Sequence, residues 1–357
     1  MKKYKVGILG CTGMVGQRFV LLISGHPWFD ISILAASPRS AGQSYGAVMR
    51  NRWVMNETIP RSVTDSVIYD ASDVEFIASQ VDFVFCAVDM PKADLLLLEE
   101  NYARAECPVI SNNSVNRYVQ DVPMIIPECN PEHIDVIPLQ RKRLGTSRGF
   151  IAVKSNCSIQ SYVPLLHPLL QYGVTDVLVC MYQAISGAGK TFEAWPEMSD
   201  NIIPFIKGEE EKSEIEPLKI WGSVTPSGII SKTEPLISAQ CLRVPLTYGH
   251  MAAIYCRFKD KPSKQIIIDS WNNYQGIPQK LSLPSAPKQF IHYYSEDDMP
   301  QAKKCRDIEF GMAISAGRLR EDRQYDYKFI GLSHNTLRGA AGGAVLMAEL
   351  LCEKKYI

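Results

Sequence analysis

The sequence predicts an α/β protein of two domains, in which a domain built on a parallel sheet precedes an α+β domain. First, a β-branched run at 4–9 meets a glycine-rich turn and then apolar residues at helical spacing. Second, the apolar runs VDFVFCAV (81–88) and CPVISNNS (107–114) end in small or polar residues, as parallel strands do where loops leave one edge of a sheet. Third, strand-like and helix-prone stretches mix beyond residue 150.

The composition is that of an ordinary globular chain. Its 357 residues are 46% hydrophobic and 21% charged, and the 38 basic residues balance the 38 acidic ones. This length allows about two domains with sizeable cores. Balanced charge gives no long-range field toward nucleic acid or an anionic membrane, so we expect small-molecule partners, no nucleic acid and no membrane.

Apolar segments and cysteines together favour a reducing compartment. The N-terminal apolar run is cut by glycines, which makes it too short for a signal-peptide core, and every longer apolar stretch is interrupted. The 10 cysteines are scattered singly without a C-x-x-C pair, so we expect no metal site. The sequence therefore predicts a cytoplasmic protein, in which a reactive thiol must be recognised by its neighbours.

The first turn carries three regularly spaced glycines. Gly10, Gly13 and Gly16 form G-x-x-G-x-x-G, a variant of the dinucleotide fingerprint, between the predicted strand and helix. Such glycines let the backbone approach a pyrophosphate at the start of a helix. The alternative is a glycine turn that serves only the path of the chain.

The end of the second predicted strand distinguishes between the two nicotinamide dinucleotides. DISILAAS (30–37) is followed by polar residues without the Asp or Glu that would bind the ribose hydroxyls of NAD. Ser37, Arg39 and Ser40 instead offer a guanidinium and hydroxyl donors to a 2′-phosphate. We therefore expect NADP(H) in a domain at residues 1–150, although a solvated polar turn remains the alternative.

The rest of the chain predicts the second domain. A basic, glycine-containing stretch at 138–149 fits a surface connection whose charges could attract a phosphate. TDVLVCMYQAIS (175–186) and MAAIYCRF (251–258) are strand-like, and GEEEKSEIEPLKIWG (208–222) is helix-prone apart from its proline. We expect this domain at 151–334, followed by an apolar C-terminal helix at 335–357.

Cys157 stands where an apolar, strand-like run gives way to a helix-like stretch, in VKSNCSIQ (153–160). A dinucleotide domain followed by a strand-end cysteine is what aldehyde oxidation through a thioester requires. His250, seven residues after Arg243, would supply a proton shuttle beside a fork for a carboxylate. A buried filler thiol and a structural histidine are the commoner roles of these residue types, and spacing alone does not exclude them.

Nine motifs in order along the chain resemble one known family. They are GCTGMVGQ, SPRSAGQSY, SNNSVNRY, IIPECN, SNCSIQ, QAISGAG, GEEEK, RVPLTYGH and SHNTLRGAAGG. The chain is similar nearly end to end to the aspartate-β-semialdehyde dehydrogenases of the archaeal and fungal type. The resemblance implies a Rossmann-like domain joined to a catalytic and dimerisation domain of the glyceraldehyde-3-phosphate-dehydrogenase-like type.

The resemblance also implies an activity. Members interconvert L-aspartate 4-semialdehyde plus phosphate with L-aspartyl-4-phosphate, using NADP(H), on the route to lysine, methionine and threonine. They work as homodimers or homotetramers. By likeness Cys157 is the nucleophile that forms the acyl-enzyme, His250 the general acid/base, and Gln183 a residue that holds the intermediate near the thiol. We expect a thiolate favoured by a nearby imidazolium.

The remaining site residues are carried over in the same way. Arg243 would clamp the substrate carboxylate and Glu209 would meet its ammonium group, although Glu210 or Glu211 could take that place. The phosphate residues would be Arg117, Asn156 and Lys212. The cofactor residues would be Gly10, Thr12, Gly13, Met14 and Val15 at the pyrophosphate, Ser37, Arg39 and Ser40 at the 2′-phosphate, and Ser186, Gly187 and Asn335 at the nicotinamide.

Three alternatives share part of this pattern. An N-acetylglutamyl phosphate reductase would have no use for an acidic ammonium partner such as Glu209. A malonyl-CoA reductase-like paralogue would favour a basic approach such as QRKRLGTSR (140–148) for the CoA phosphates. A non-catalytic NADP-binding redox sensor would need one low-pKa cysteine and no phosphate site.

Overall fold

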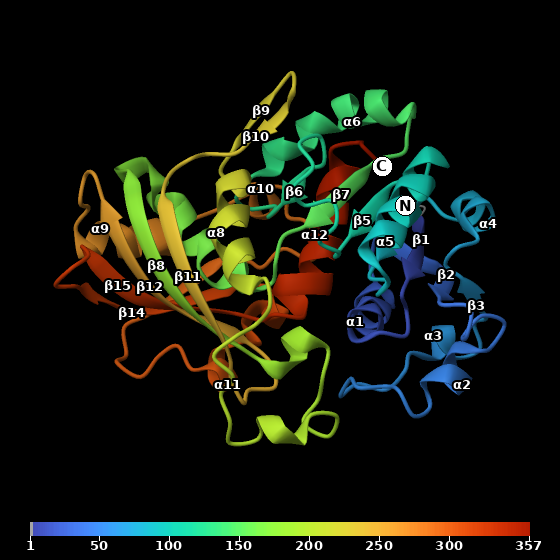
Figure 1. The fold of residues 1–357 in the computed structure, drawn as a ribbon, viewed down its shortest axis with the longest axis horizontal. Coiled ribbons are helices and arrows are strands. Elements are labelled where there is room, and N and C mark those ends of the chain that lie inside the picture. Colours follow the sequence, from blue (N-terminus) through green and yellow to red (C-terminus); the bar gives the residue numbers. More distant parts are fainter. Residues whose placement is uncertain (1–2) are drawn as a thin grey trace.

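A computed structural model describes residues 3–357 of the protein. Met1 and Lys2, where the predicted first domain begins, lie outside the described residues. The N-terminal part is a parallel sheet in the order β3-β2-β1-β4-β5-β7-β6 (Figure 1). Its strands are β1 (Tyr4–Leu9), β2 (Phe29–Ala36), β3 (Ile68–Asp70), β4 (Phe83–Cys86), β5 (Val109–Ser111), β6 (Met124–Ile125) and β7 (Ile151–Lys154). Its helices are α1 (Met14–Ile23), α2 (Tyr45–Met49), α3 (Arg61–Thr64), α4 (Val74–Gln80), α5 (Lys92–Arg104) and α6 (Ile137–Leu144).

The second part is a mixed sheet in the order β11-β8-β12-β15-β14-β13, with a separate hairpin of β9 and β10. The strands are β8 (Val174–Gln183), β9 (Ser223–Thr225), β10 (Gly228–Ile230), β11 (Leu236–Arg243), β12 (His250–Phe258), β13 (Ile291–Tyr294), β14 (Ile314–Glu321) and β15 (Tyr327–Ser333). The helices are α7 (Val163–Leu166), α8 (Glu209–Ile220), α9 (Lys264–Asn272), α10 (Ile277–Lys280) and α11 (Ala302–Cys305). The predicted α/β class, a parallel sheet followed by an α+β unit, is confirmed. Within residues 3–357, no helix is both long and apolar enough to cross a membrane.

The chain passes between the two sheets at the cysteine turn. Strand β7 begins one residue after the predicted boundary at 150, yet it pairs with β5 and β6 of the first sheet. After β15, a π-helical turn at Leu337–Ala341 leads into α12 (Gly342–Glu353). This last helix, red in Figure 1, contacts α1, β5 and β7. A helix from the end of the chain therefore packs against the first sheet.

Two hydrophobic clusters hold this arrangement. In β4 the side chains alternate: Phe83 and Phe85 pack in the cluster that includes α1 and α12, whereas Val84 and Cys86 belong to the other cluster. That second cluster continues from α5 to buried residues of β8, β12 and β15. The second cluster therefore spans both sheets, and it also contains Ile159 and Tyr162 from the turns after Cys157.

The basic segment at 138–149 differs from its predicted local structure. Helix α6 covers its first half and ends where Gly145 adopts a left-handed conformation, with φ 73°. Straight-chain Lys and Arg side chains suit a helix as readily as a solvated loop, so their charge alone does not distinguish the two.

The stretch after Cys157 also differs, because it is a series of short turns rather than one helix. A 3-10 turn at Ser158–Ser161 precedes α7, and another 3-10 turn follows at His167–Tyr172. Pro164 and Pro168 stand at the second positions of these last two segments. Since proline has no backbone N–H and clashes with the preceding turn, a continuous helix is not possible there.

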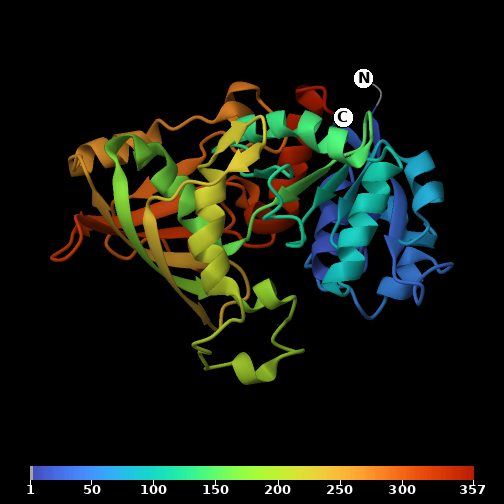
Figure 2. The same cartoon turned by 45° about the horizontal axis from the view of Figure 1, so that its top comes forward.

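A long excursion leaves the second sheet between Gly189 and Gly208. It projects away from both sheets as the yellow-green segment of Figures 1 and 2, and a 3-10 turn at Pro196–Met198 lies within it. Both glycines adopt left-handed conformations, with φ 68° and 72°. The excursion begins just after Gly187 and ends at Glu209, two of the predicted site residues.

Candidate active site

Three predicted site residues meet at one edge of the second sheet. Strands β8 and β11 run parallel, with Gln183 paired to Arg243 at their carboxyl ends. Strand β12 runs antiparallel to β8 and begins at that edge with His250. Because side chains of neighbouring strands at one edge point into the same space, a glutamine, an arginine and a histidine converge there.

Cys157 reaches this edge from the first sheet. It follows β7 by three residues and starts the 3-10 turn at Ser158–Ser161. Gly339 packs against it so closely that a Cβ on Gly339 would lie 2.8 Å from the Cβ of Cys157. The C-terminal segment therefore fixes the position of the cysteine from the other side.

Cys157 and His250 form a pair in which the ring is oriented by the backbone. The Sγ atom of Cys157 lies 3.5 Å from Nε2 of His250. The backbone N–H of Ala184 donates to Nδ1 of the same ring at 3.1 Å. Since Nδ1 accepts, we assign the proton of the neutral imidazole to Nε2, which makes His250 a hydrogen-bond donor toward the sulfur.

Burial controls the charges of this pair. Burial and the nearby Arg243 lower the pKa of His250 to about 3, so its ring is neutral at pH 7. The expected imidazolium beside the thiol is therefore not the state that this geometry favours. Burial and Glu209 raise the pKa of Cys157 to about 11, against opposing charges on Lys154, Arg117 and Arg243. Cys157 is therefore a thiol at pH 7 in this site, and the cations Lys154, Arg117 and Arg243, rather than a charged histidine, are the groups that favour its thiolate form.

Glu209 is the centre of a buried polar cluster beside the cysteine. Its carboxylate accepts hydrogen bonds from Lys212 (2.8 Å), Gln183 (3.1 Å) and Asn156 (3.1 Å). Burial alone would raise its pKa, but the charge and hydrogen bond of Lys212 and the two amides lower it overall. Glu209 is therefore a carboxylate whose hydrogen bonds link α8 to β8 and to the cysteine turn.

The neighbouring glutamates do not share this position. Glu210 accepts a hydrogen bond from the backbone N–H of Cys241 at 3.1 Å, at the edge of β11. Glu211 is exposed. Of the three glutamates between which the sequence leaves the choice open, Glu209 is the one beside Cys157.

Arg243 lies beside an opening that a glycine creates. Its Nη1 donates to the backbone oxygen of Ala184 at 2.7 Å. A Cβ on Gly187 would lie 2.8 Å from that Nη1 and 3.0 Å from Nε2 of His250. The missing side chain leaves room at the place where a guanidinium and an imidazole face one another.

Arg117 approaches from the loop after β5. Its Nη1 donates to Glu216 at 2.8 Å and its Nη2 to the backbone oxygen of Asn112 at 3.2 Å. Its Nε atom is buried and has no hydrogen-bond partner among the residues the structure describes. The guanidinium is therefore held by two groups and keeps one buried donor free.

The glycine turn after β1 is shaped for close approach. A Cβ on Gly10 would overlap the backbone oxygen of Ala87, and one on Gly16 would overlap that of Gly10. Helix α1 starts at Met14 without a side-chain cap, and Gln17 fixes the turn by donating to the backbone oxygen of Thr12 at 3.0 Å. The open start of a ten-residue helix behind a glycine turn fits the pyrophosphate of a dinucleotide.

A polar cavity of about 450 Å³ lies at the end of β2. Ser37, Arg39 and Ser40, the residues that the sequence suggests for a 2′-phosphate, line it. Gln43 and Arg52 line it as well, and sequence reasoning missed both. Arg52 lies outside the motif, 13 residues after Arg39, so only the fold brings its charge to this cavity.

Asn335 connects two loops of the second sheet, the one after β8 and the one before β12. Its Nδ2 donates to Oγ of Ser186 at 2.8 Å, and its Oδ1 accepts from the backbone N–H of Gly249 at 2.9 Å. All three residues are close to His250 in the chain or in space. The predicted nicotinamide residues Ser186, Gly187 and Asn335 therefore border the Cys157–His250 pair, whereas the predicted residues at 10–15 and 37–40 lie in the loops after β1 and β2.

Two charged residues near the cysteine were not found from the sequence. Lys154 is 2% exposed, and the one hydrogen bond of its Nζ to another described residue is a 3.4 Å contact with the backbone oxygen of Ser155. Burial and the charges of Arg338 and Arg117 lower its pKa to about 7. Glu216 is fully buried on α8. For Lys154 the available signal was a single charge in an apolar strand. For Glu216 it was the spacing of seven residues from Glu209, which places both glutamates on one face of the helix.

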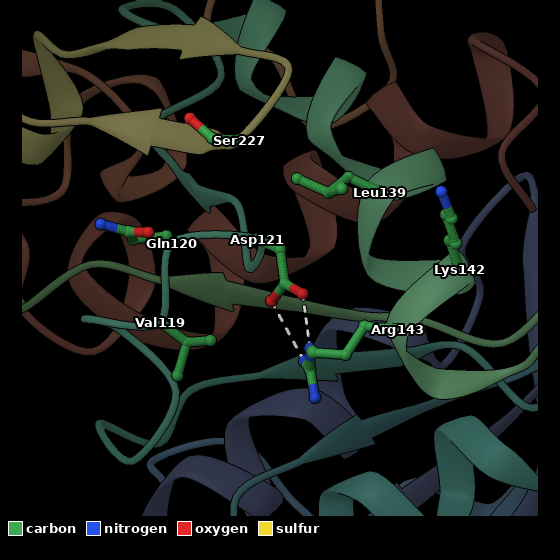
Figure 3. A pocket seen from close by; sticks show the side chains of 7 residues that line it. All are labelled: Val119, Gln120, Asp121, Leu139, Lys142, Arg143 and Ser227. Atoms are coloured by element: carbon green, nitrogen blue, oxygen red, sulfur yellow. Dashed lines mark hydrogen bonds and ion pairs between the residues drawn. The ribbon is translucent and has the colours of Figure 1, made fainter.

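A further cavity of about 570 Å³ lies among α6, the loop at 119–121 and the β9–β10 hairpin (Figure 3). Figure 3 shows the guanidinium of Arg143 turned toward Asp121, to which it donates at 2.5 Å and 3.1 Å. Arg141 donates to backbone oxygens of Arg148 and Tyr356. These arginines of the basic segment are therefore already paired, which does not favour them as a CoA phosphate site.

Comparison with known proteins gives matches along nearly the whole chain. The family model "Semialdehyde dehydrogenase, NAD binding domain" matches residues 5–137, and "Semialdehyde dehydrogenase, dimerisation domain" matches residues 166–338. The chain is 40% identical to the aspartate-semialdehyde dehydrogenase of Candida albicans over 100% of both chains. It is 39% identical to that of Archaeoglobus fulgidus, covering 99% of this chain and 100% of the relative. A crystal structure of the Candida albicans enzyme with NADP superposes with a TM-score of 0.89 at 38% identity, covering 99% of this chain and 100% of that one.

Proposed function

The chain belongs to the aspartate-semialdehyde dehydrogenase family, and from that membership we propose how its residues carry out the reaction. It is an NADP-dependent oxidoreductase that acts on an aldehyde. The reaction is the reduction of L-aspartyl-4-phosphate to L-aspartate 4-semialdehyde and phosphate, in the biosynthesis of lysine, methionine and threonine. The observation that carries the proposal is the Cys157–His250 pair, 3.5 Å apart, beside the polar cluster of Glu209.

Cys157 is the nucleophile. Its sulfur attacks the acyl carbon of the aspartyl phosphate, the bond from that carbon to the phosphate oxygen breaks, and a thioester forms as the departing phosphate takes up the thiol proton. Bound NADPH supplies the hydride that reduces the thioester. The resulting oxyanion lies within reach of Nε2–H of His250, which stabilises it, and cleavage of the carbon–sulfur bond then releases the aldehyde. His250 acts as a donor in this direction because Ala184 occupies its Nδ1.

The charged ends of the substrate find complementary partners. Arg243, beside the opening left by Gly187, receives the α-carboxylate. Glu209 receives the ammonium group, and its buried carboxylate already binds cationic and amide donors. Gln183 holds the intermediate from the same edge. The choice of Glu209 over its two neighbours is supported by its position beside Cys157.

Phosphate is received by Arg117, Asn156 and Lys212. Arg117 offers a buried Nε–H that is not otherwise used by the described residues. Asn156 and Lys212 now donate to Glu209, so binding of the substrate ammonium to that carboxylate frees donors for the anion. This arrangement couples the two ends of the substrate site.

The residues that would hold NADP(H) run from the cysteine region to the loops of the first sheet. Ser186, Gly187 and Asn335 form the nicotinamide end, and the open start of α1 with Gly10, Thr12, Gly13, Met14 and Val15 holds the pyrophosphate. Ser37, Arg39 and Ser40 bind the 2′-phosphate in the cavity at the end of β2. The glycine turn and this polar cavity support the assignment.

The domain division, assembly and compartment complete the proposal. We place an NADP-binding domain at 1–150 with β7 added to it, a catalytic and dimerisation domain up to 334, and a C-terminal helix at 335–357 that packs on the first domain.

The chain has a dimerisation domain, and a homodimer or homotetramer is supported by the outer face of the second sheet. There Leu178 of β8 and Leu236 of β11 are 36% and 66% exposed. We expect a cytoplasmic enzyme.

The test is NADPH formation from L-aspartate 4-semialdehyde and NADP. The parent protein is expected to turn over only with phosphate or arsenate, whereas Cys157→Ser is expected to lose turnover and still bind NADP. A parent protein that binds NADP but shows no phosphate-dependent turnover would contradict the proposed function.

A further inference from the structure

Glu216 joins two parts of the site that come from different loops. It is 0% exposed and lies on α8, two helical turns after Glu209. Its Oε1 accepts from Nη1 of Arg117 at 2.8 Å, and its Oε2 accepts from the backbone N–H of Asn156 at 2.5 Å. Arg117 belongs to the loop after β5, and Asn156 directly precedes Cys157. One carboxylate therefore connects the guanidinium to the cysteine turn.

The two bonds need a carboxylate, because each oxygen serves a different donor. An amide of the same shape has a single acceptor oxygen and would present its NH₂ group to one of the two donors. Glu216→Gln must therefore break either the bond to Arg117 or the bond to Asn156. A buried N–H or guanidinium facing another donor is destabilised, so the affected group has to move.

Other residues hold the backbone of the Arg117 loop without Glu216. Nζ of Lys219 donates to the backbone oxygens of Arg117, Val119 and Val122 at 2.7, 2.6 and 2.9 Å. Glu99 of α5 accepts from the side chain of Asn116 at 2.7 Å, on the other side of the loop. Loss of the charge at Glu216 should therefore leave the backbone of the loop in place and disturb only the guanidinium of Arg117 or the cysteine turn.

We propose that Glu216 is a positioning residue that sets the relative placement of the phosphate-binding Arg117 and the nucleophile Cys157. This inference rests on the proposed roles of those two residues. The carboxylate keeps the guanidinium and the turn in register, so that phosphate meets the thioester carbon next to the sulfur it displaces. Attack of phosphate on the thioester therefore depends strongly on Glu216, whereas the binding of NADP depends on it little.

The experiment compares Glu216→Gln with the parent enzyme and with Glu214→Gln as a matched control. Glu214 lies on the same helix, but within residues 3–357 its carboxylate accepts only the backbone N–H of Ala239 at 3.0 Å, which a glutamine oxygen can also do. Two quantities are measured: the KM for phosphate in NADPH formation and the rate at which iodoacetamide alkylates Cys157. We expect Glu216→Gln to raise the phosphate KM by on the order of tenfold and to change the alkylation rate severalfold, while the KM for NADP and Glu214→Gln follow the parent.

Glu216→Asp is the second variant. It keeps two acceptor oxygens on a shorter side chain, and its phosphate KM is expected to lie between those of the parent and Glu216→Gln. A purely structural role of the charge would not predict this intermediate value. If Glu216→Gln fails to fold, the aspartate variant alone tests the positioning role of Glu216, and its phosphate KM should still be higher than that of the parent. Unchanged phosphate KM and alkylation rate in a folded variant would overturn the inference. A parent without phosphate-dependent turnover would instead refute the proposed function, and the alkylation rates would then still test the link from Glu216 to the cysteine turn.

Discussion

Ala184 donates its backbone N–H to Nδ1 of His250 at 3.1 Å, and this bond turns the protonated Nε2 toward Cys157. A neutral imidazole has one N–H, so the backbone decides which atom carries it. The pKa of His250, lowered to about 3 by burial and Arg243, keeps the ring in this neutral form across the physiological range. The site therefore presents a fixed hydrogen-bond donor to the sulfur and, in the proposed reaction, to the oxygen of the reacting carbonyl.

Replacing His250 by asparagine removes that donor from the position of Nε2. We expect kcat to fall by about 100- to 1,000-fold, the range typical of a lost donor to an oxyanion. The measurement is steady-state NADPH formation, with NADP binding as the control because the ring does not contact the glycine turn. A kcat within a factor of two of the parent, with normal folding, would show that His250 has no role in the chemistry.

Gly187→Ala fills the opening between the guanidinium and the imidazole. Its methyl group would come within 2.8 Å of Nη1 of Arg243 and 3.0 Å of Nε2 of His250. Because displacements of this size misalign reacting groups, we expect kcat/KM for the semialdehyde to fall by about 100-fold while the unfolding temperature stays close to that of the parent. Unchanged kcat/KM would mean that the substrate does not use this opening.

Arg39→Asp places a carboxylate in the cavity proposed for the 2′-phosphate. Repulsion and the lost guanidinium should raise the KM for NADP by about tenfold to 100-fold and leave that for NAD little changed. Arg61→Asp, an exposed arginine at the start of α3, is the matched control and should leave both values as in the parent. Equal effects of the two substitutions would remove the case for recognition of the 2′-phosphate by Arg39.

Lys154→Met should change how stability depends on pH. The pKa of Lys154 is lowered to about 7 in the folded protein, so the unfolded chain binds more protons between that pH and the ordinary lysine value near 10.4. Stability due to this residue therefore rises with pH through that window, by at most roughly 1.4 kcal/mol per unit, and the penalty is complete below it.

The methionine variant should accordingly be more stable than the parent at pH 7, and the difference should shrink toward pH 10. Urea unfolding at several pH values measures it, with the exposed Lys142→Met as the control that should follow the parent. A constant difference between Lys154→Met and the parent at all pH values would show that Lys154 is charged throughout.

Local patterns in the sequence sufficed for much of the fold. The strand, glycine turn and helix at 4–23 were predictable because backbone periodicity and glycine spacing are local properties, and Cys157 was recognisable by its place at the end of an apolar run. The helix at 137–144 was not, because basic residues suit both helix and loop. The prolines at 164 and 168 broke a helix that apolar spacing alone would have continued.

The site was predictable in its reactive groups but not in its supports. Cys157, His250 and Arg243 follow from chemistry and from family motifs, whereas Glu216 contacts residues 99 and 60 positions away in the chain. The proton position on His250 depends on a backbone N–H of another strand, and the charge state of Lys154 depends on burial. None of these is a property of a short stretch of sequence.

The most direct test of the account is a single turnover of the enzyme with NADP and L-aspartate 4-semialdehyde in the absence of phosphate, followed by mass spectrometry of the Cys157 peptide. The account predicts a burst of one NADPH per active site and an aspartyl group attached to Cys157. When phosphate is added, the adduct should be lost and NADPH formation should continue beyond one per site. NADPH formation without any adduct on Cys157, or an adduct on another cysteine, would contradict it.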